Sequence, residues 1–505
     1  MLYRFFRKLT AIITHKLFII AFSVLLQLII LMAMLVFLSE YFVLFNTILL
    51  ILSIVTSIYI VNIDENPAYK LTWVMLIMVL PVLGGIIYIL FGGHKVPKEL
   101  SIRDNQAFSE FKDHVIQDEK TYQKLANDSI SACKQFYYLW NCASFPVYEH
   151  SQTTYYDSGE AKWEALKEAL KQAQKYIFLE YFIIAEGIMW QEILDILIQK
   201  SKEGVDVRVL YDDFGCSTTL SSDYDRFLNS LGIKCKIFNR LTPSLSVSMN
   251  NRDHRKIVVI DGQVAFSGGV NLADEYINQK VRFGHWKDSA IKIEGEAVWS
   301  FSLMFLQFWN FDEANKDDVE QFHLLKQDCQ LIDDGFVLPF SDSPTDDETI
   351  GRNIHLNMIN HAKSYVYITT PYLVIDYEMI SALKNAAKQG IDVRIITPHI
   401  PDKKYVFAVT RSNYETLVNA GVKIYEYKPG FIHSKNVFCD DVFGVVGSVN
   451  MDYRSYYLHY ECGVLMYKSK AIKDMKKDYL NTLDQCIQIT KEEIKKTPWY
   501  IINIK

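Results

Sequence analysis

An internal repeat is the feature of this sequence that most restricts its fold. The first copy begins with KYIFLEYFIIAEG (Lys175–Gly187) and continues, after an amphipathic stretch, with KEGVDVRVLYD (Lys202–Asp212). The second copy begins with SYVYITTPYLVID (Ser364–Asp376) and continues in the same way with KQGIDVRIITP (Lys388–Pro398). Their β-branched and aromatic residues predict strands, and the stretches between them have helical periodicity. This alternation predicts an α/β fold with mainly parallel sheets flanked by helices.

Each copy ends in a further predicted strand, which completes the order strand, helix, strand, helix, strand. These strands are LGIKCKIF (Leu231–Phe238) and AGVKIYEY (Ala420–Tyr427). Gly204 and Gly390 precede the middle strands at equivalent positions and suit the C-terminal cap of a helix. A chain of 505 residues has room for two such units and a further region. The sequence therefore predicts a membrane region (1–100), a helical linker (101–147) and two similar α/β halves (148–326 and 327–505).

The first hundred residues are much more apolar than the rest of the chain. Three stretches free of charged residues follow one another, at about 17–38, 42–61 and 72–93. Each reaches the ~20 residues that a helix needs to cross a bilayer. Pro81, Gly84 and Gly85 interrupt the third stretch, which predicts a bent, re-entrant or interfacial element there. A cleaved signal peptide would account only for the first stretch, and its apolar region would be too long.

Basic residues on either side of this region predict its orientation. They precede the first stretch (Arg4, Arg7, Lys8 and Lys16) and follow the third (Lys95, Lys98 and Arg103). Basic flanks favour the cytoplasmic side of a membrane. Both basic flanks lie on the cytoplasmic side if the third stretch does not span the membrane. We therefore expect a multi-pass membrane protein whose larger, C-terminal part lies on the cytoplasmic side.

Two copies of one short motif carry the polar residues that suit chemistry. The first lies in NNRDHRKIVVIDGQVAFSGGVN (Asn250–Asn271) and the second in FIHSKNVFCDDVFGVVGSVN (Phe431–Asn450). Both read H-x-K-x4-D-x6-G-[GS]-x-N, and five identities at fixed spacing, twice in one chain, indicate function. The matched residues are His254, Lys256, Asp261, Gly268 and Asn271 in the first copy, and His433, Lys435, Asp440, Gly447 and Asn450 in the second.

These residue types match the needs of phosphodiester transfer. Histidine and lysine two positions apart share one face of a strand, so they can meet a ligand together. The lysines and the asparagines, Asn271 and Asn450, supply donors for the growing negative charge of the phosphate. Two histidines supply a nucleophile and a general acid near neutral pH. The motifs have no ligand cluster of a metal centre, so we expect chemistry without metal or cofactor.

Single residues of these motifs also have purely structural explanations. His254, beside Arg252 and Arg255, could lie in a charged surface turn, and His433 could be a hydrogen-bonded core residue. The duplication favours function over both explanations. Tyr372 follows the strand that opens the second copy, where either a substrate contact or aromatic packing would suit it.

The two motifs resemble the paired HKD signatures of the phospholipase D superfamily. The surrounding residues narrow the resemblance to bacterial cardiolipin synthases: N-x-R-x-H-R-K-I continues to GGVNLADEY, and LPVLGGIIYILFGG (Leu80–Gly93) precedes the two α/β halves. The similarity covers the chain from about Phe42 to its C-terminus. The apolar stretch 17–38 departs from the two-segment pattern expected of this family. The resemblance implies two similar α/β halves around one shared active site, in a protein of the bacterial cell membrane.

The resemblance also implies a role for each motif residue. His254 would be the nucleophile and His433 the acid that protonates the leaving alcohol. Lys256 and Lys435 would complete the catalytic sets, and Asn271 and Asn450 would bind the substrate phosphate.

The acidic residues of the site would have supporting roles. Asp261 and Asp440 belong to the catalytic motifs, where they would be structural or supporting groups. A further carboxylate orients each histidine in this family. The matching positions are Asp288 in HWKDSAIKIEG and Glu461 in LHYECGVLM.

Four functions remain open on the sequence alone. The resemblance implies that one phosphatidylglycerol gives its phosphatidyl group to another, forming cardiolipin and glycerol in a lipid bilayer. Hydrolysis, or transfer to another alcohol such as serine, would use the same catalytic residues. A nuclease is disfavoured because the net charge is −6, so no overall basic field attracts nucleic acid. An inactive membrane scaffold is disfavoured because both motifs are intact.

Overall fold

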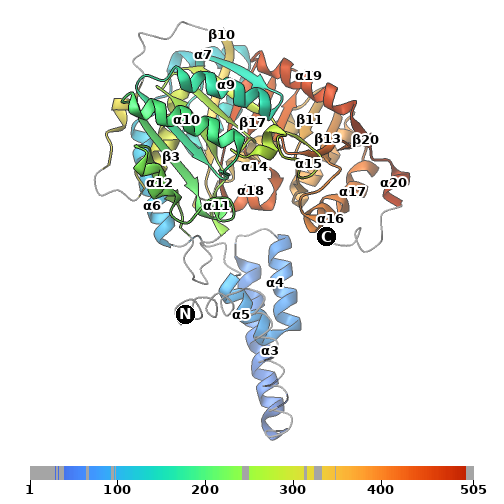
Figure 1. Ribbon diagram of the computed structural model, residues 1–505. Helices are drawn as coiled ribbons and strands as arrows, with labels where there is room; N and C mark the ends of the chain where they lie inside the picture. Colours follow the sequence, from blue (N-terminus) through green and yellow to red (C-terminus); the bar gives the residue numbers. More distant parts are fainter. Residues whose placement is uncertain are drawn as a thin grey trace. The chain divides into compact units, whose positions relative to one another are not determined.

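The computed structural model describes residues 25, 29, 32, 39–63, 67–91, 96, 98–240, 250–311, 316–323, 333–346 and 348–495. The chain divides into two compact units (Figure 1). The apolar unit comprises Met1–Lys98 and Leu241–Asn250, and the sheet unit comprises Glu99–Arg240 and Asn251–Lys505.

The apolar unit contains helices α3 (Ser39–Asn62), α4 (Pro67–Val79) and α5 (Pro81–Phe91). Val43–Asn62, within α3, is long and apolar enough to cross a membrane. The helical path is interrupted between α4 and α5, as the proline predicts, because proline lacks a backbone N–H and disfavours the helical conformation of the preceding residue. The re-entrant character of the segment stays a prediction. The apolar stretch 17–38 lies outside the described residues, apart from 25, 29 and 32.

Three helices lead into the sheet unit: α6 (Lys98–Asp113), α7 (Glu119–Asp128) and α8 (Ile130–Ala143). Asp118 caps α7 by accepting from the Thr121 amide, and Ser129 caps α8 by accepting from the Ala132 amide. The Asp104 carboxylate of α6 is buried, and it accepts hydrogen bonds from Ser343 and Thr345. Residue 104 therefore ties α6 to the second half of the sheet unit.

Within the described residues, one sheet of 16 strands runs through both halves of this unit: 15 follow one another across the sheet, and the sixteenth, β5 (Arg252–Asp253), branches off it. The strands of the first half are β1 (Tyr148–Tyr156), β2 (Tyr176–Tyr181), β3 (Asp206–Asp212), β4 (Lys234–Phe238), β6 (Lys256–Ile260), β7 (Val264–Gly268) and β9 (Ala290–Gly295). Those of the second half are β10 (Asp333–Asp342), β11 (Tyr365–Thr369), β13 (Asp392–Pro398), β14 (Lys423–Tyr427), β16 (Asn436–Cys439), β17 (Phe443–Gly447), β19 (His459–Tyr467) and the edge strand β20 (Cys486–Gln488).

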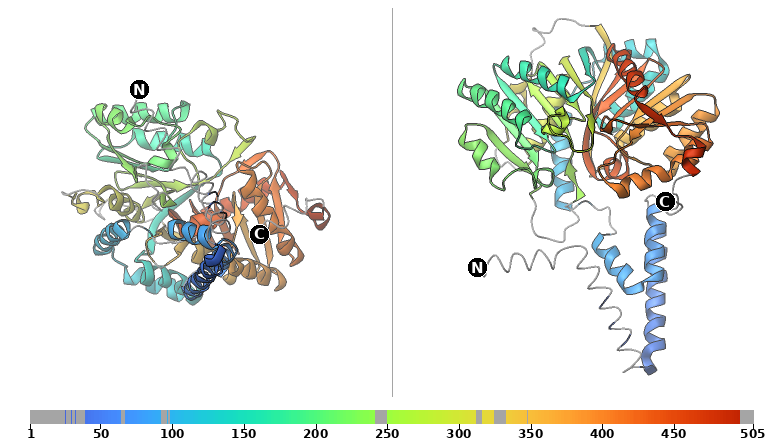
Figure 2. Two further views of the ribbon diagram at one scale, coloured as in Figure 1. Left: turned by 90° about the horizontal axis from the view of Figure 1, so that it is seen from below. Right: turned by 45° about the vertical axis from the view of Figure 1, so that its right-hand side comes forward.

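The order of these strands is the same outward from the centre in both directions. β1 and β10 pair antiparallel in the middle of the sheet. On one side follow β9, β7, β6, β2, β3 and β4, and on the other β19, β17, β16, β11, β13 and β14. Figure 2 shows the two halves side by side, the first in green to yellow and the second in orange to red. The predicted α/β class and the two repeated halves are confirmed.

The expectation of mainly parallel sheets is wrong for the sheet as a whole. Along the main path of this sheet, and within the described residues, parallel pairing is confined to the three βα-connected strands of each half, β2–β3–β4 and β11–β13–β14. The motif strands instead form antiparallel hairpins, β6–β7 and β16–β17, because a short turn rather than a helix joins them. The sheet is therefore mixed, and the single continuous sheet replaces two separate ones.

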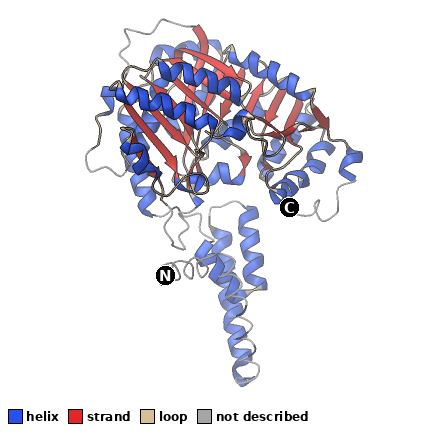
Figure 3. Ribbon diagram, in the orientation of Figure 1, coloured by secondary structure: helices blue, strands red, loops and turns tan. Residues whose placement is uncertain are grey.

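Helices cover both faces of the sheet (Figure 3). In β2, Ile177 and Leu179 belong to one buried cluster, with α9 (Gly159–Lys171) and α10 (Ile188–Lys202). Phe178 points to the opposite face, where its ring stacks on Phe305 of α13 (Val298–Trp309) at 4.4 Å. The second half has helices α14 (Ile350–His361), α15 (Tyr377–Lys388), α16 (Lys404–Ser412), α17 (Tyr414–Asn419) and α19 (Ala471–Leu483). Gly204 and Gly390, with φ of 92° and 91°, follow α10 and α15 as predicted.

Two very short pairs of parallel strands connect the halves and determine how the motif histidines are placed. β5 (Arg252–Asp253) pairs with the start of β19, in the register His459↔Arg252 and Tyr460↔Asp253. β15 (Gly430–Ile432) pairs with β8 (His285–Lys287), in the register Phe431↔Trp286 and Ile432↔Lys287. In both pairs, the strand that leads into a motif histidine lies beside a strand of the other half. The predicted limits of the two halves stay predictions.

Candidate active site

The two motif histidines face one cavity of about 550 Å³ between the halves. His254 and His433 both line it, and each side chain is almost buried. Asn271 and Asn450 line the same cavity, so the structure brings these four predicted residues together. Each asparagine follows the turn at the end of β7 or β17.

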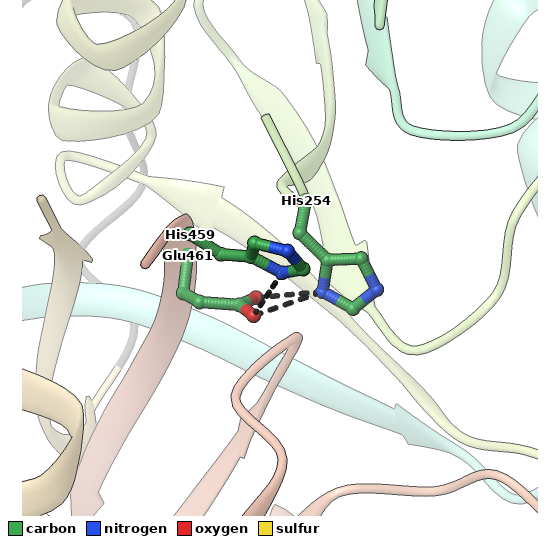
Figure 4. Close-up of side chains that lie close together, drawn as sticks. All are labelled: His254, His459 and Glu461. Atoms are coloured by element: carbon green, nitrogen blue, oxygen red, sulfur yellow. Dashed lines mark hydrogen bonds and ion pairs between the residues drawn. The ribbon is translucent and has the colours of Figure 1, made fainter. Parts of the chain in front are cut away.

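Each histidine is held by a carboxylate from the other half. Glu461 places both carboxylate oxygens 2.9 Å from Nδ1 of His254 (Figure 4). Asp288 lies 2.7 Å from Nδ1 of His433 through Oδ2. Both carboxylates are fully buried. A carboxylate at Nδ1 keeps the proton on that nitrogen and leaves the lone pair of Nε2 for a ligand.

The two short parallel pairs explain this crossed arrangement. Asp253 pairs with Tyr460, and the residues that follow them are His254 and Glu461. This register therefore places the histidine beside the carboxylate. The His254 amide donates to the Tyr460 carbonyl at 2.9 Å and holds the two segments in this register. The second site repeats this geometry, with the His433 amide donating to the Lys287 carbonyl at 2.7 Å.

The variable position of the G-[GS]-x-N segment is adapted to the carboxylate beside it. In the second half this position is Ser448, whose hydroxyl donates to Glu461. In the first half it is Gly269, and a Cβ there would lie 2.1 Å from Oδ1 of Asp288. A serine would therefore collide with Asp288, which leaves glycine as the residue that fits. Ser455 donates a further hydrogen bond to Glu461.

The motif lysines differ from the predicted geometry. His254 precedes β6, which begins at Lys256, so the two residues do not share a regular strand. Lys256 Nζ donates to the carbonyl of His254, and Lys435 Nζ donates to that of His433. Both ammonium groups lie beneath the histidines and outside the set of residues that line the cavity. Burial lowers the pKa of Lys256 to about 8 and that of Lys435 to about 7.

Burial and positive neighbours also act on the histidines. Burial, followed by Lys256 and Lys435, lowers the pKa of His254 well below its ordinary value. Burial and then Lys435 lower the pKa of His433 to about 4, although Asp288 acts in the opposite direction. Burial tends to raise the pKa of Asp288, but His433 and Lys435 more than offset it, so this carboxylate stays ionised. Both imidazoles are therefore neutral in the unliganded site at neutral pH.

The asparagines present different groups to the cavity. Asn271 accepts from the Ile183 amide at 3.1 Å and donates to the Tyr276 hydroxyl at 2.6 Å, so its side chain is fixed. Asn450 is held through its backbone N–H, which donates to Ser455 at 2.9 Å. Its buried Oδ1 has no hydrogen-bond partner within the described part of the chain, which leaves this oxygen for a ligand donor.

The motif aspartates lie away from the cavity. Asp261 accepts from the amides of Gln174, Lys175 and Tyr176 at 2.7–2.8 Å, where β2 begins. Asp440 makes the same three bonds to Lys363, Ser364 and Tyr365, where β11 begins, at 2.6–2.9 Å. Both aspartates have a positive φ, 53° and 55°, in the turn of the motif hairpin. Placing them in the catalytic set is therefore wrong in position, and the supporting role expected of them fits the geometry.

The basic residues beside His254 are buried, so a surface turn does not describe this segment. Arg255 is 1% exposed and donates to Glu180 at 2.6 Å. Arg252 is also 1% exposed, and its guanidinium lies 3.8 Å from Asp212. Tyr372 lines the cavity, which favours the substrate-contact interpretation of this residue over packing alone.

Several polar residues of the cavity were not identified from the sequence, among them Arg454 and His459. His459 lies two positions before Glu461, and its ring centroid is 5.4 Å from that of His254 (Figure 4). In the other half Trp286 stands at this position, 5.3 Å from His433. A histidine in the LHYE segment, where the first half has tryptophan in HWKD, was the available signal.

His254, His459 and Glu461 also form a group that could bind a metal ion, with ligand atoms within 4.8 Å of one another. Arg454 donates to Nε2 of His459 at 2.9 Å, so the proton of the neutral ring sits on Nδ1. That nitrogen faces Glu461 at 3.7 Å and has no lone pair to offer a cation. The group thus fits a metal ion poorly, and the expectation of chemistry without metal or cofactor stays a prediction.

Two models of known protein families match this chain. Residues 166–290 and 355–483 match the family model described as "Cardiolipin synthase, PLD-like domain". The chain belongs to this cardiolipin synthase family. Residues 51–93 match a second model, "Phospholipase D-nuclease N-terminal". The predicted resemblance is therefore confirmed.

Individual proteins are similar to this chain over most of their length. A protein of Streptococcus mutans is 45% identical over 442 residues, which cover 87% of this chain and 95% of that one. A cardiolipin synthase of Halalkalibacterium halodurans is 35% identical over 461 residues, 90% of this chain and 91% of that one. The crystal structure of a phosphatidylserine synthase from Haemophilus influenzae shares the fold, with a TM-score of 0.54, 16% identity, and coverage of 74% of this chain and 96% of that chain.

Proposed function

We propose that this chain is a cardiolipin synthase, which joins two phosphatidylglycerol molecules into diphosphatidylglycerol and releases glycerol. The observation that carries the proposal is the single cavity of a cardiolipin synthase family member, lined by one motif histidine from each half. Two imidazoles facing one cavity suit a reaction that forms and then breaks a phosphorus–nitrogen bond.

In the first step, Nε2 of His254 attacks the phosphorus of one phosphatidylglycerol. For this step His433 also carries a proton on Nε2, which it takes up from water when the anionic phosphate binds and offsets the positive charges around the ring. The P–N bond forms as the bond to the glycerol oxygen breaks, and His433 gives that oxygen its Nε2 proton. Glu461 prepares His254 by holding the proton on Nδ1. The lowered pKa of His254 suits a neutral nucleophile, and the ionised Asp288 suits His433 as the group that carries a proton.

In the second step, a hydroxyl of another phosphatidylglycerol attacks the phosphatidyl-histidine. His433, now neutral, takes the proton of this hydroxyl while the P–N bond breaks and His254 is restored. The positive charges of Lys256 and Lys435, which lie behind the histidines and outside the cavity lining, oppose the growing negative charge of the phosphate. No other group is needed to balance atoms and protons.

The location of the enzyme follows from its substrate and its apolar unit. We infer a bacterial cell membrane protein with more than one membrane segment and with the sheet unit on the cytoplasmic side. The spanning length of Val43–Asn62 and the basic flanks of the apolar region support this inference. The membrane region (1–100), the linker (101–147) and the halves (148–326 and 327–505) are the domain limits that we propose.

A product assay tests the function directly. Full-length protein in phosphatidylglycerol vesicles should release glycerol and form diphosphatidylglycerol in equal amounts, both measured by mass spectrometry. His254→Ala is the matched control and should form neither. Phosphatidic acid as the main product would instead identify a hydrolytic phospholipase D. Product that forms only when another alcohol such as serine is added would identify a different phosphatidyltransferase.

A further inference from the structure

Large apolar side chains are exposed around the mouth of the cavity. Val281 is 81% exposed, Tyr405 71%, Phe214 43% and Ile400 37%. Burying such side chains is favourable, so exposed ones gathered in one place mark a surface that contacts something apolar. These four residues come from both halves of the sheet unit.

Their position at the mouth follows from their contacts. Phe214 and Tyr405 themselves line the cavity. Val281 is followed directly by Arg282 and Phe283, which line it too.

Ile400 lies against the same loop as Val281. Its Cδ1 is 3.2 Å from where a Cβ of Gly284 would stand. Its amide also donates to the carbonyl of Gly430, which pairs with His285 next to that glycine. The loops at 280–284 and 400–405 therefore form one continuous rim.

Basic residues alternate with the apolar ones on this rim. Lys280 and Arg282 flank Val281, and Lys403 and Lys404 precede Tyr405. All four are exposed. Arg282 is paired with Glu275 at 2.9 Å and Lys403 lies 4.0 Å from Asp402, whereas Lys280 and Lys404 have no ion pair within the described residues. These two lysines therefore add unpaired positive charge to the rim of a chain whose net charge is −6. Basic residues interspersed with aromatic and aliphatic ones are typical of surfaces that bind anionic lipid.

We propose that this rim, formed by Phe214, Lys280, Val281, Ile400, Lys404 and Tyr405, inserts into the surface of an anionic bilayer. The proposal rests on the proposed function only in taking the substrate to be a lipid. A cavity whose mouth touches the bilayer admits a phosphate headgroup while the acyl chains stay in the membrane. The sheet unit thus has a membrane contact of its own, distinct from the spanning length of α3.

The chain offers a control surface for this proposal. Ile116, between α6 and α7, is 84% exposed, and Ile130 at the start of α8 is 71% exposed. Neither residue lines the cavity. They match Val281 in exposure and chemistry and differ from it in location.

A fluorescent probe tests insertion without reference to catalysis. We would introduce Val281→Cys or Ile116→Cys into full-length protein carrying Cys142→Ser, because Cys142 is an exposed thiol, and label each with an environment-sensitive dye. In phosphatidylglycerol vesicles the probe at 281 should shift to the blue and be quenched by lipids with a nitroxide on the acyl chain. The probe at 116 should do neither. Phosphatidylcholine vesicles or high salt should reduce the effect at 281.

Two results of the probe experiment would overturn the proposal. A probe at 281 that neither shifts nor is quenched lies in water. A probe that shifts but is not quenched by the nitroxide lipids lies against protein, such as the apolar unit or a second copy of the chain. If residue 281 inserts into the bilayer but the protein makes no cardiolipin, the proposed membrane contact of the rim is supported and the proposed cardiolipin synthase activity is rejected.

Kinetics give an independent readout. Val281→Asp and Lys404→Glu should each raise KM on phosphatidylglycerol vesicles by about fivefold, since each basic or apolar contact with an anionic surface contributes about that factor. Turnover of short-chain phosphatidylglycerol below its micelle concentration should stay unchanged, because no bilayer is present. Ile116→Asp should alter neither. Equal losses on monomers and vesicles would show damage to the site itself, and no loss on vesicles would show that the rim does not bind.

Discussion

Glu461, from the second half of the chain, lies 2.9 Å from Nδ1 of His254 in the first half. The reverse pairing is also present: Oδ2 of Asp288, in the first half, lies 2.7 Å from Nδ1 of His433 in the second half. Neither half therefore supplies both a motif histidine and the carboxylate that holds it. The two halves form one shared site, in which each half supplies the histidine of one pair and the carboxylate of the other.

The crossed carboxylates lead to the first prediction. Glu461→Gln removes the negative charge that stabilises the positive charge of the His254 ring as its bond to phosphorus forms, while keeping the size of the side chain. We expect kcat/KM to fall about 10- to 100-fold, the usual effect of losing a group that orients a catalytic histidine. Asp288→Asn should have a similar effect through His433. Glycerol release measures both, and Glu415→Gln, at an exposed position, is the control. Losses below twofold would show that the carboxylates serve only the fold.

The second prediction concerns the histidines as a unit. His254→Ala and His433→Ala should each reduce turnover by about three orders of magnitude or more, and the double variant should be little worse than either. The reason is that both rings act on one phosphorus. Glycerol release and diphosphatidylglycerol formation should be lost together. Half of the activity remaining in one single variant would indicate two independent sites.

The sequence was sufficient to predict the repeated halves and the two histidines, because both depend on patterns that are local in the chain. Glu461 and Asp288 were also found, but not the crossing, which depends on the two short parallel pairs between the halves. The sheet was expected to be mainly parallel because that expectation came from the βα repeats alone, and hydrophobic period does not show how the motif strands pair with them. His459 was missed because its importance arises only from its position beside His254.

The third prediction separates a structural aspartate from a catalytic one. Asp261→Ala leaves three backbone amides without their acceptor and places alanine at a positive φ. We expect a loss of at least about 3 kcal/mol of stability, seen as a lower Tm in detergent. The kcat of the protein that remains folded should stay within a few-fold of the original. Asp440→Ala should behave in the same way. A large loss of kcat with an unchanged Tm would return these residues to the catalytic set.

The fourth prediction uses the lowered pKa values of the lysines. Lys435 and Lys256 lose their protons as the pH rises through about 7 and about 8, because burial lowers both values. Anion binding should therefore be strong below pH 7 and weaken above it. Sulfate, whose charge is constant in this range, should inhibit about tenfold less at pH 9 than at pH 6.

Lys435→Arg is the control for this pH dependence. A guanidinium keeps its charge throughout the range, so sulfate inhibition should depend less on pH in this variant. An inhibition constant that is equally flat in the unmodified enzyme would contradict the assignment of the lysines to the phosphate site. If sulfate inhibition of Lys435→Arg depends on pH as steeply as in the unmodified enzyme, the pH dependence arises from a group other than Lys435.

The last prediction concerns the competition between lipid and water for the phosphatidyl-histidine. Synthesis and hydrolysis share this intermediate, so the product ratio depends on which hydroxyl reaches it first. Holding the acceptor close to the site is worth several kcal/mol, and the apolar unit keeps the enzyme where lipid hydroxyls are concentrated. A chain that begins at Lys98 keeps α6 and its bonds from Asp104 to the second half. We expect this shortened chain to be less active on vesicles and to form a larger share of phosphatidic acid.

Glycerol release counts first-step turnovers in both proteins, so the ratio of diphosphatidylglycerol to glycerol isolates the second step. In the full-length protein this ratio should be close to one. A shortened chain with lower activity but the same ratio would show that the apolar unit only anchors the enzyme. In that case exclusion of water would belong to the sheet unit alone, and the aromatic residues around His433, Trp286 and Phe431 among them, would be the side chains to vary next.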